Sequence, residues 1–152
     1  AAKGIALYLA AEGAAEIDLA VRNLEKGEEL SARIRESGAA SRLYSLGRLE
    51  EPELGRYGLI VQTTPLGMKN VVGTLDFPYE RLEKEQVVAD IVYNPLETEF
   101  LKNCGAAGAK AIGGLEMLVY QGYHSFRIWT GLEGDPELML ETGRKILEAT
   151  HE

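Results

Sequence analysis

The segment VVADIVYNPLET, residues 87–98, is the stretch of sequence that decides the fold class. Its first part, residues 87–93, is rich in β-branched side chains and almost continuously apolar, which is typical of a strand buried on both faces of a parallel sheet. Asn94 and Pro95 then favour the N-cap and the first position of a helix, and Gly105 can end that helix. The segment therefore predicts a strand followed directly by a helix, which is the repeating unit of an α/β protein.

Strands and helices alternate along the rest of the chain in the same way. Four further strands are expected, at residues 17–21, 41–46, 58–61 and 110–112. Segments of helical periodicity separate them, and such crossover connections join parallel strands. We therefore predict the α/β class, with a parallel sheet, helices on both of its faces, and a single domain over residues 1–152.

The helices are predicted from apolar spacing and from capping residues. The chain opens directly with a helix that ends near Gly13, and no strand stands in front of it. Asn23 can cap the next helix, a long helix follows Gly114, and Asp135 with Pro136 opens the last one. The expected core residues are Leu30 and Ile34 in the helix after Asn23, and Leu138, Ile146 and Leu147 in the last helix.

Composition and motifs exclude several classes of function. The net charge of −8 argues against nucleic-acid binding, which needs clustered Lys and Arg. No apolar run approaches the length of a membrane span, so no membrane partner is expected. The residue spacing that metal ligands need is missing, so no metal site is expected. Cys104 is the only cysteine and permits no internal disulfide, which fits a reducing cytoplasm.

Ligands of open parallel sheets bind where strands end, so the residues that follow the strands are the candidates for a site. Arg22 suits the 2′-phosphate of NADP, although spacing alone favours a solvated surface arginine. Thr63 and Thr64 can flank a cofactor or form an ordinary turn. Asp90 lies in an apolar run, and a structural role bonded to backbone N–H groups is favoured for it. Tyr93 can contact a substrate or fill the core.

The loop before the long helix and the helix itself add two candidates. Gly113 and Gly114 allow a ligand to approach the backbone closely, or they form only a tight turn. Gln121 lies two helical turns after Gly114 in an otherwise apolar helix, which suggests a hydrogen-bonding role. The sequence contains no G-x-G-x-x-G loop, which a dinucleotide-binding protein would be expected to have.

Four segments taken together resemble the family of shikimate dehydrogenases, the NADP-dependent enzymes of aromatic amino-acid biosynthesis. These are QTTPLGM (62–68), ADIVYNPLET (89–98), GGLEMLVYQG (113–122) and SFRIWTG (125–131), in the family's order and spacing. The resemblance implies a Rossmann-like domain that lacks its first strand and its glycine-rich loop, with Ala1 as the last residue of that loop. It also implies that the helices of residues 115–152 lean on a substrate domain outside this chain.

The resemblance assigns roles to residues of this sequence. It implies cofactor binding by Ala1, Val21, Arg22, Asn23, Lys26, Thr63, Thr64, Ile91, Gly114 and Met117, and substrate binding by Tyr93 and Gln121. Val21 and Asn23 depart from the Asn and Thr that flank the phosphate-binding Arg in the family. The catalytic Lys and Asp of the family have no counterpart here, so no catalytic residue is expected in this chain.

The implied reaction is the reversible reduction of 3-dehydroshikimate to shikimate by NADPH, and the chain alone is expected to be inactive. Two alternatives remain open. One is a quinate/shikimate dehydrogenase that uses NAD or both cofactors, which Arg22 disfavours. The other is a non-catalytic Rossmann-like interaction module. Without a first strand, neighbouring strand edges would be exposed, so self-association of the chain is also expected.

Overall fold

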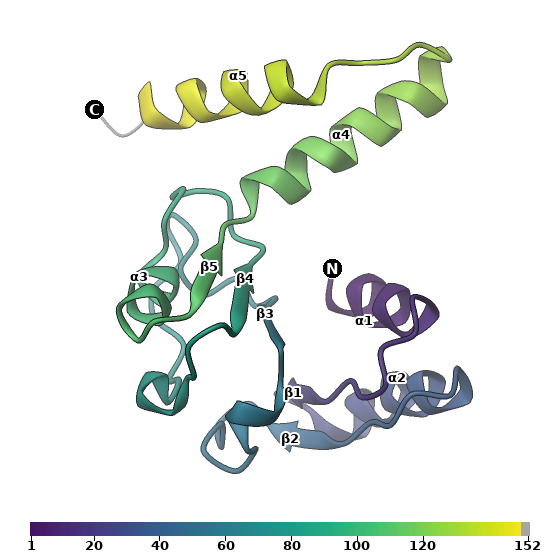
Figure 1. The fold of residues 1–152 in the computed structure, drawn as a ribbon, viewed down its shortest axis with the longest axis vertical. Coiled ribbons are helices and arrows are strands. Elements are labelled where there is room, and N and C mark those ends of the chain that lie inside the picture. Colours follow the sequence, from purple (N-terminus) through teal and green to yellow (C-terminus); the bar gives the residue numbers. More distant parts are fainter. Residues whose placement is uncertain (150–152) are drawn as a thin grey trace. The chain divides into compact units, whose positions relative to one another are not determined.

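The computed structural model describes residues 1–149, and these form two compact units. The first unit contains residues 1–53 and 76–78. The second unit contains residues 54–75 and the chain from Tyr79 onward. Each unit has its own helices and its own parallel sheet (Figure 1), so the predicted α/β class and parallel strand pairing are confirmed.

The first unit is built from two helices and two strands. Its elements are α1 (Ala2–Ala11), β1 (Leu19–Val21), α2 (Leu24–Glu36) and β2 (Leu43–Ser45). β1 and β2 pair in parallel, with Leu19 opposite Leu43. The core of the unit contains buried Ala6, Ile34 and Ala39, with Leu30 packed against it. The predicted core positions of α2 are therefore confirmed.

Local sequence rules explain where the two helices of this unit begin and end. α1 ends at Ala11, and Gly13 follows with φ of 90°, a left-handed conformation that suits glycine. The Asn23 side chain caps α2, because its Oδ1 accepts a hydrogen bond from the Lys26 N–H at 3.0 Å. The predicted helix stop and the predicted cap are both confirmed.

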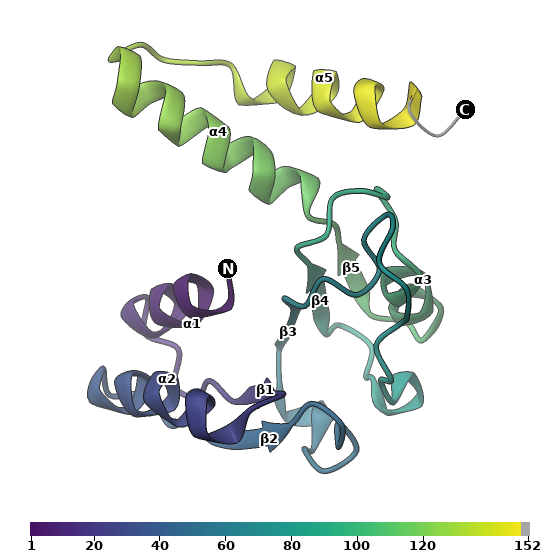
Figure 2. The same ribbon diagram turned by 180° about the vertical axis from the view of Figure 1, so that it is seen from behind.

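The second unit contains a three-stranded parallel sheet in the order β3-β4-β5. Its strands are β3 (Leu59–Gln62), β4 (Val87–Asp90) and β5 (Lys110–Ile112), and its helices are α3 (Glu99–Ala106), α4 (Leu115–Thr130) and α5 (Pro136–Ala149), with short 3-10 turns η1 (Leu54–Arg56) and η2 (Tyr79–Arg81). Figure 2 shows β4 between its two partners and α3 beside the sheet. None of the helices among residues 1–149 is long and apolar enough to cross a membrane.

The central strand is shorter than predicted and buried on one face only. β4 ends at Asp90 rather than at Tyr93, and along it only Val88 and Asp90 are buried. The strand ends there because the Asp90 carboxylate accepts the Val92 N–H at 2.9 Å, which turns the chain out of the ladder. The residues after Asp90 form a loop instead of more strand.

The following helix begins four residues later than predicted. Thr98, not Asn94, is the N-cap of α3, and its Oγ1 accepts the Leu101 N–H at 3.3 Å. Asn94 is held in the loop, because its carbonyl oxygen accepts the Lys69 N–H at 3.0 Å. The helix also runs one residue beyond Gly105, to Ala106, and the left-handed glycine after it is Gly108.

α4 and α5 form a helical hairpin, and its contact face differs from the prediction. Asp135 does open α5, since its Oδ1 accepts the Leu138 N–H at 3.0 Å. However, Leu138 and Ile146 are 59% and 60% exposed and are not core residues. α5 packs through Gly143, where an added Cβ would lie 3.3 Å from Leu115 of α4. Leu147, on that side of the helix, is partly buried.

Candidate functional site

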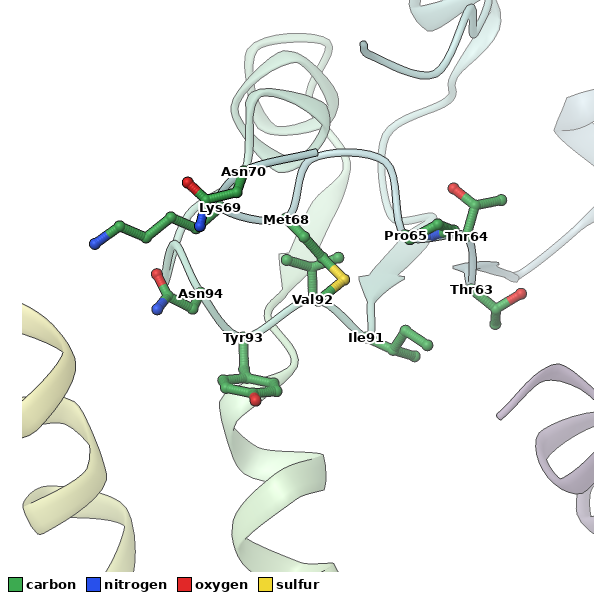
Figure 3. A pocket seen from close by; sticks show the side chains of 10 residues that line it. All are labelled: Thr63, Thr64, Pro65, Met68, Lys69, Asn70, Ile91, Val92, Tyr93 and Asn94. Carbon is green, nitrogen blue, oxygen red and sulfur yellow. The ribbon is translucent and has the colours of Figure 1, made fainter. Parts of the chain in front are cut away.

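A pocket of about 500 Å³ lies beside the carboxyl ends of β3 and β4. Two loops form it, residues 63–70 after β3 and residues 91–94 after β4 (Figure 3). Its lining residues are Thr63, Thr64, Pro65, Met68, Lys69, Asn70, Ile91, Val92, Tyr93 and Asn94. The sheet edge predicted to carry the site therefore does carry a pocket.

The register of the two strands places both loops at one edge of the sheet. β3 and β4 are parallel, and their last residues, Gln62 and Asp90, are directly paired. The loops therefore leave the sheet at the same level, which is the usual position of ligand sites in open parallel sheets. The Ile91 N–H donates to the Gln62 carbonyl oxygen at 3.1 Å and continues the pairing for one more residue.

The pocket is apolar on one side and polar at its rim. Met68 lies beside Val92 in Figure 3, and Ile91 adds a third apolar side chain. Tyr93 is 39% exposed, and its ring carries the hydroxyl away from the loop. Within the part of the chain that the structure describes, the lining includes Lys69 and no carboxylate. Such a surface suits a flat, uncharged or anionic organic group rather than a cation.

Asp90 lies beneath the pocket and has a structural role, as favoured from the sequence. The residue is 1% exposed, and its carboxylate accepts hydrogen bonds from the Val92 N–H, the Thr98 hydroxyl and the Gln62 amide. Burial raises the pKa of Asp90, and the three hydrogen bonds from Val92, Thr98 and Gln62 act in the opposite direction. These contacts within the protein engage both oxygens of the carboxylate.

Gly114 stands where the backbone leaves no room for a side chain. A Cβ atom there would lie less than 3.0 Å from the Ile91 carbonyl oxygen and 2.8 Å from the Val92 carbonyl carbon. The Gly114 N–H also donates to the Val92 carbonyl oxygen at 3.2 Å. Gly114 therefore joins the N-terminus of α4 to the loop that lines the pocket.

The residues expected to bind the 2′-phosphate lie together in the first unit. Arg22, Asn23 and Lys26 are exposed at the N-terminus of α2, directly after β1, and Val21 is partly buried. A helix N-terminus offers unpaired N–H groups to an anion, and Arg22 and Lys26 add two cations. The Asn23 side chain is already engaged as the helix cap. Ala1 is exposed and precedes α1.

Two predicted residues on α4 do not line the pocket. Met117 is partly buried, and Gln121 is exposed, with its carbonyl oxygen accepting the Ser125 hydroxyl at 2.8 Å. Cys104 is fully buried in α3, and burial raises its pKa to about 12, so the thiol is not a nucleophile at neutral pH. No cluster of three or more His, Cys, Asp or Glu side chains among the described residues could hold a metal ion.

The structure brings together four of the residues predicted to bind ligand and adds others. Thr63, Thr64, Ile91 and Tyr93 line the same pocket. The lining also includes Pro65 and Asn94, which the sequence places after predicted strands, and it includes Met68, Lys69, Asn70 and Val92, which were not predicted. All of them fall within or directly after the segments QTTPLGM and ADIVYNP. Met68, Lys69 and Asn70 belong to the loop after the predicted strand 58–61, whereas Val92 lay within the predicted strand 87–93.

Comparison with known proteins supports one family. Residues 114–142 match the model of the shikimate 5′-dehydrogenase C-terminal domain. A shikimate dehydrogenase (NADP(+)) from Methanosarcina acetivorans is 40% identical over 150 residues, which cover 98% of this chain and 53% of that protein. The chain thus spans about half the length of the curated relatives it matches.

Solved structures agree with this assignment. The structure of shikimate 5-dehydrogenase from Listeria monocytogenes, in complex with shikimate and NAD, matches with a TM-score of 0.85 and 26% identity over 93% of this chain and 51% of that one. The ligand-free 5-ketofructose reductase of a Gluconobacter species matches with a TM-score of 0.83 and 31% identity, over 95% of this chain and 52% of that one. On sequence and on fold, the chain belongs to the shikimate dehydrogenase family.

Proposed function

We propose that this chain is the NADP-binding half of a shikimate dehydrogenase, which reversibly reduces 3-dehydroshikimate to shikimate. The observation that carries the proposal is the pocket formed by residues 63–70 and 91–94. Eight of its ten lining residues lie within two of the four segments that carry the family resemblance, QTTPLGM and ADIVYNPLET, and Lys69 and Asn70 follow the first of them. A third segment, GGLEMLVYQG, supplies Gly114, which packs directly against this pocket loop.

The residues of the chain fit a nicotinamide dinucleotide phosphate in two places. In the second unit, Thr63, Thr64 and Ile91 offer a surface for a flat ring, and Gly114 keeps the backbone beside it free of a side chain. In the first unit, Arg22 and the N-terminus of α2 offer a guanidinium and backbone N–H groups to the 2′-phosphate. Further cofactor-binding residues are proposed in both units: Ala1, Val21, Asn23 and Lys26 in the first, and Met117 in the second.

The proposed roles of the protein are binding and orientation. NADPH, when bound, supplies the hydride for the ring carbonyl of the substrate. Tyr93 presents a hydroxyl at the pocket, and Gln121 an amide on α4, and both are proposed to hold substrate hydroxyls. Met68, Ile91 and Val92 exclude water from the apolar side of the pocket. No proton-transfer residue is proposed in this chain, so the chain alone is proposed to be inactive.

The test of the proposal is shikimate-dependent reduction of NADP⁺ by the full-length protein that carries this chain. Arg22→Ala is expected to raise the KM for NADP⁺ by about tenfold and to leave the KM for NAD⁺ unchanged, because only NADP⁺ has the 2′-phosphate. Arg33→Ala, which removes an exposed arginine farther along α2, is the matched control. Absence of shikimate oxidation, or equal effects of Arg22→Ala and Arg33→Ala on NADP⁺, would contradict the proposal.

The second candidate function is a related dehydrogenase that prefers another substrate or cofactor. The similar Listeria structure contains NAD, and the similar Gluconobacter protein is a 5-ketofructose reductase, so substrate and cofactor choice vary among the chain's structural neighbours. A quinate/shikimate dehydrogenase using NAD would show a higher kcat/KM with NAD⁺ than with NADP⁺. A non-catalytic module would bind neither dinucleotide, which calorimetry on the full-length protein would detect.

The remaining proposals concern domain organisation, partners and location. The two units are proposed to form one dinucleotide-binding domain, with α4 and α5 leaning on a substrate domain. The small-molecule substrate is the proposed partner, and neither a nucleic acid nor a membrane is proposed. Self-association of the isolated chain is proposed from exposed strand edges. The single cysteine supports a reducing cytoplasm as the proposed location.

A further inference from the structure

Three buried polar side chains meet directly beneath the pocket. Gln62, Asp90 and Thr98 are 4%, 1% and 1% exposed, although they come from the end of β3, the end of β4 and the N-cap of α3. Burying polar groups costs free energy unless each of them finds hydrogen-bond partners. The hydrogen-bond partners of these three side chains therefore indicate what the cluster does.

The Asp90 carboxylate is the centre of the cluster. The Thr98 hydroxyl donates to Oδ2 at 2.7 Å, the Val92 N–H donates to Oδ1 at 2.9 Å, and the Gln62 side-chain amide donates to Oδ1 at 3.3 Å. Val92 belongs to the pocket lining, so the carboxylate bonds directly to the loop of residues 91–94. Thr98 in turn accepts the Leu101 N–H and so links the cluster to α3.

Gln62 connects the same carboxylate to the other pocket loop. Its Nε2 donates to the Leu66 carbonyl oxygen at 3.0 Å, and its Oε1 accepts the Thr64 N–H. The Thr64 hydroxyl accepts the Leu66 N–H at 3.3 Å, which closes the turn. Gly67 of this loop lies against Thr98, where an added Cβ would be 3.4 Å from the threonine side chain.

Both loops of the pocket are thus bonded to one buried carboxylate, one directly and one through Gln62. We propose that Gln62, Asp90 and Thr98 are positioning residues that hold the two loops in the single arrangement that binds ligand. This inference rests on the proposed function for its ligands. It assigns no contact with substrate or cofactor to the three residues, since all of them are buried beneath the lining.

The chain offers a matched control for a merely structural role. Gln86 is also a buried glutamine, 5% exposed, and it directly precedes β4 at the opposite end of the strand from the pocket. Its Nε2 donates to the carbonyl oxygens of Leu54 and Tyr57 at 2.6 Å each, and its Oε1 accepts the Glu83 N–H at 2.7 Å. Replacing either glutamine by leucine leaves comparable buried groups unpaired, but only Gln62 is bonded to a pocket loop.

The first experiment compares Gln62→Leu with Gln86→Leu in the full-length protein. Both are expected to lower the midpoint of thermal unfolding by similar amounts. Gln62→Leu is expected to raise the KM for shikimate or NADP⁺ about tenfold. Loops that are no longer held in the single ligand-binding arrangement bind ligand more weakly. Gln86→Leu is expected to leave both KM values within about twofold of the original protein. Equal KM values in the two variants would overturn the proposal.

The second experiment uses Thr98, because a hydroxyl can be removed and then restored. Thr98→Val deletes the donor to Asp90, and Thr98→Ser retains it. The valine variant is expected to raise KM in the manner of Gln62→Leu, and the serine variant is expected to restore the original value. Wild-type kinetics in a folded Thr98→Val protein would contradict the proposal.

Amide hydrogen exchange separates failure of this inference from failure of the proposed function. Peptides covering residues 63–70 and 91–94 are expected to exchange faster in Gln62→Leu than in Gln86→Leu, whether or not the protein oxidises shikimate. If the original protein lacks that activity but the loops exchange as expected, the proposed function is wrong and the positioning network stands. Unchanged exchange in both loops of Gln62→Leu would refute the network itself.

Discussion

Gly114 packs against the backbone of Val92 so closely that a Cβ atom on Gly114 would lie 2.8 Å from the Val92 carbonyl carbon. Real Cβ atoms do not approach a carbonyl carbon to this distance, and the neighbours here are backbone atoms that cannot rotate away. The start of α4 and the pocket loop are therefore in contact only because residue 114 has no side chain.

Gly114→Ala is accordingly expected to destabilise the protein by about 2–4 kcal/mol, because the loop or the helix must shift. Gly105→Ala is the control. Gly105 lies inside α3 with nothing within 4 Å of an added Cβ, and alanine there is expected to stabilise the protein by about 0.5–1 kcal/mol. Urea unfolding of the two variants measures both changes. A Gly114→Ala protein as stable as the original would show that the contact is not rigid.

Asn23 is expected to contribute to stability as a helix cap, independently of any ligand. Asn23→Ala removes the acceptor for the Lys26 N–H and is expected to cost about 1 kcal/mol, whereas Asn23→Asp retains an acceptor and is expected to cost much less. Chemical unfolding without NADP⁺ measures this difference. If Asn23→Ala lowers stability only when NADP⁺ is present, the side chain acts on the ligand and not as a cap.

Cys104 is expected to resist alkylation in the folded protein. Its thiol is fully buried and its pKa is raised from 9.0 to about 12 by burial, so neither access nor thiolate is available near neutral pH. Mass spectrometry after iodoacetamide treatment is expected to show one adduct in urea and none in buffer. Rapid modification in buffer would show that the region around α3 opens readily.

The raised pKa of Cys104 also predicts how the stability of the protein changes with pH. The unfolded thiol ionises near pH 9.0 while the folded thiol stays protonated to about pH 12, so the folded state binds the proton more tightly. The contribution of Cys104 is therefore complete below pH 9.0 and is lost as the pH rises toward 12. Cys104→Ala is expected to unfold with a weaker dependence on pH in this window. An identical dependence would contradict the assignment.

Trp129 is the only tryptophan and reports on the outer side of α4. It is 82% exposed, so iodide is expected to quench its fluorescence strongly in the isolated chain. In the full-length protein, the fluorescence of Trp129 is the difference between the original protein and its Trp129→Phe variant. If α4 leans on a substrate domain, iodide should quench this difference only weakly. Equal quenching in the isolated chain and in the full-length protein would show that this side of α4 remains in water.

The sequence pattern was sufficient for the α/β class, because strand and helix periodicities are local properties. It failed where a tertiary contact decided the outcome. Asn94 and Pro95 satisfy the local rule for a helix start, but α3 begins later because Thr98 is held by Asp90. In α5, periodicity cannot say which apolar side packs, and Gly143 decides it by allowing close approach to Leu115.

Prediction of the pocket was limited for the same reason. Thr63 and Thr64 were found because they directly follow a predicted strand, where parallel sheets place their ligands. Ile91 lay within the predicted strand 87–93 and was assigned to the cofactor only through the family resemblance. Met68 and Asn94 line the pocket only because the first loop folds back on the second. That return depends on Gly67, with φ of 89°, and on the hydrogen bond from the Lys69 N–H to the Asn94 carbonyl oxygen. Spacing along the chain encodes neither contact.

The direct pairing of Gln62 with Asp90 also bears on how the sheet finds its correct alignment. A slip of one residue would set Val61 opposite Asp90 and turn the side chains of one strand to the other face. The buried carboxylate would then lose its amide donor, so the misaligned pairing is penalised twice. A hydrocarbon pair at these positions would tolerate the slip far better. The two residues thus favour the correct strand register during folding. An evolutionary change at one of them is expected to require a compensating change at the other.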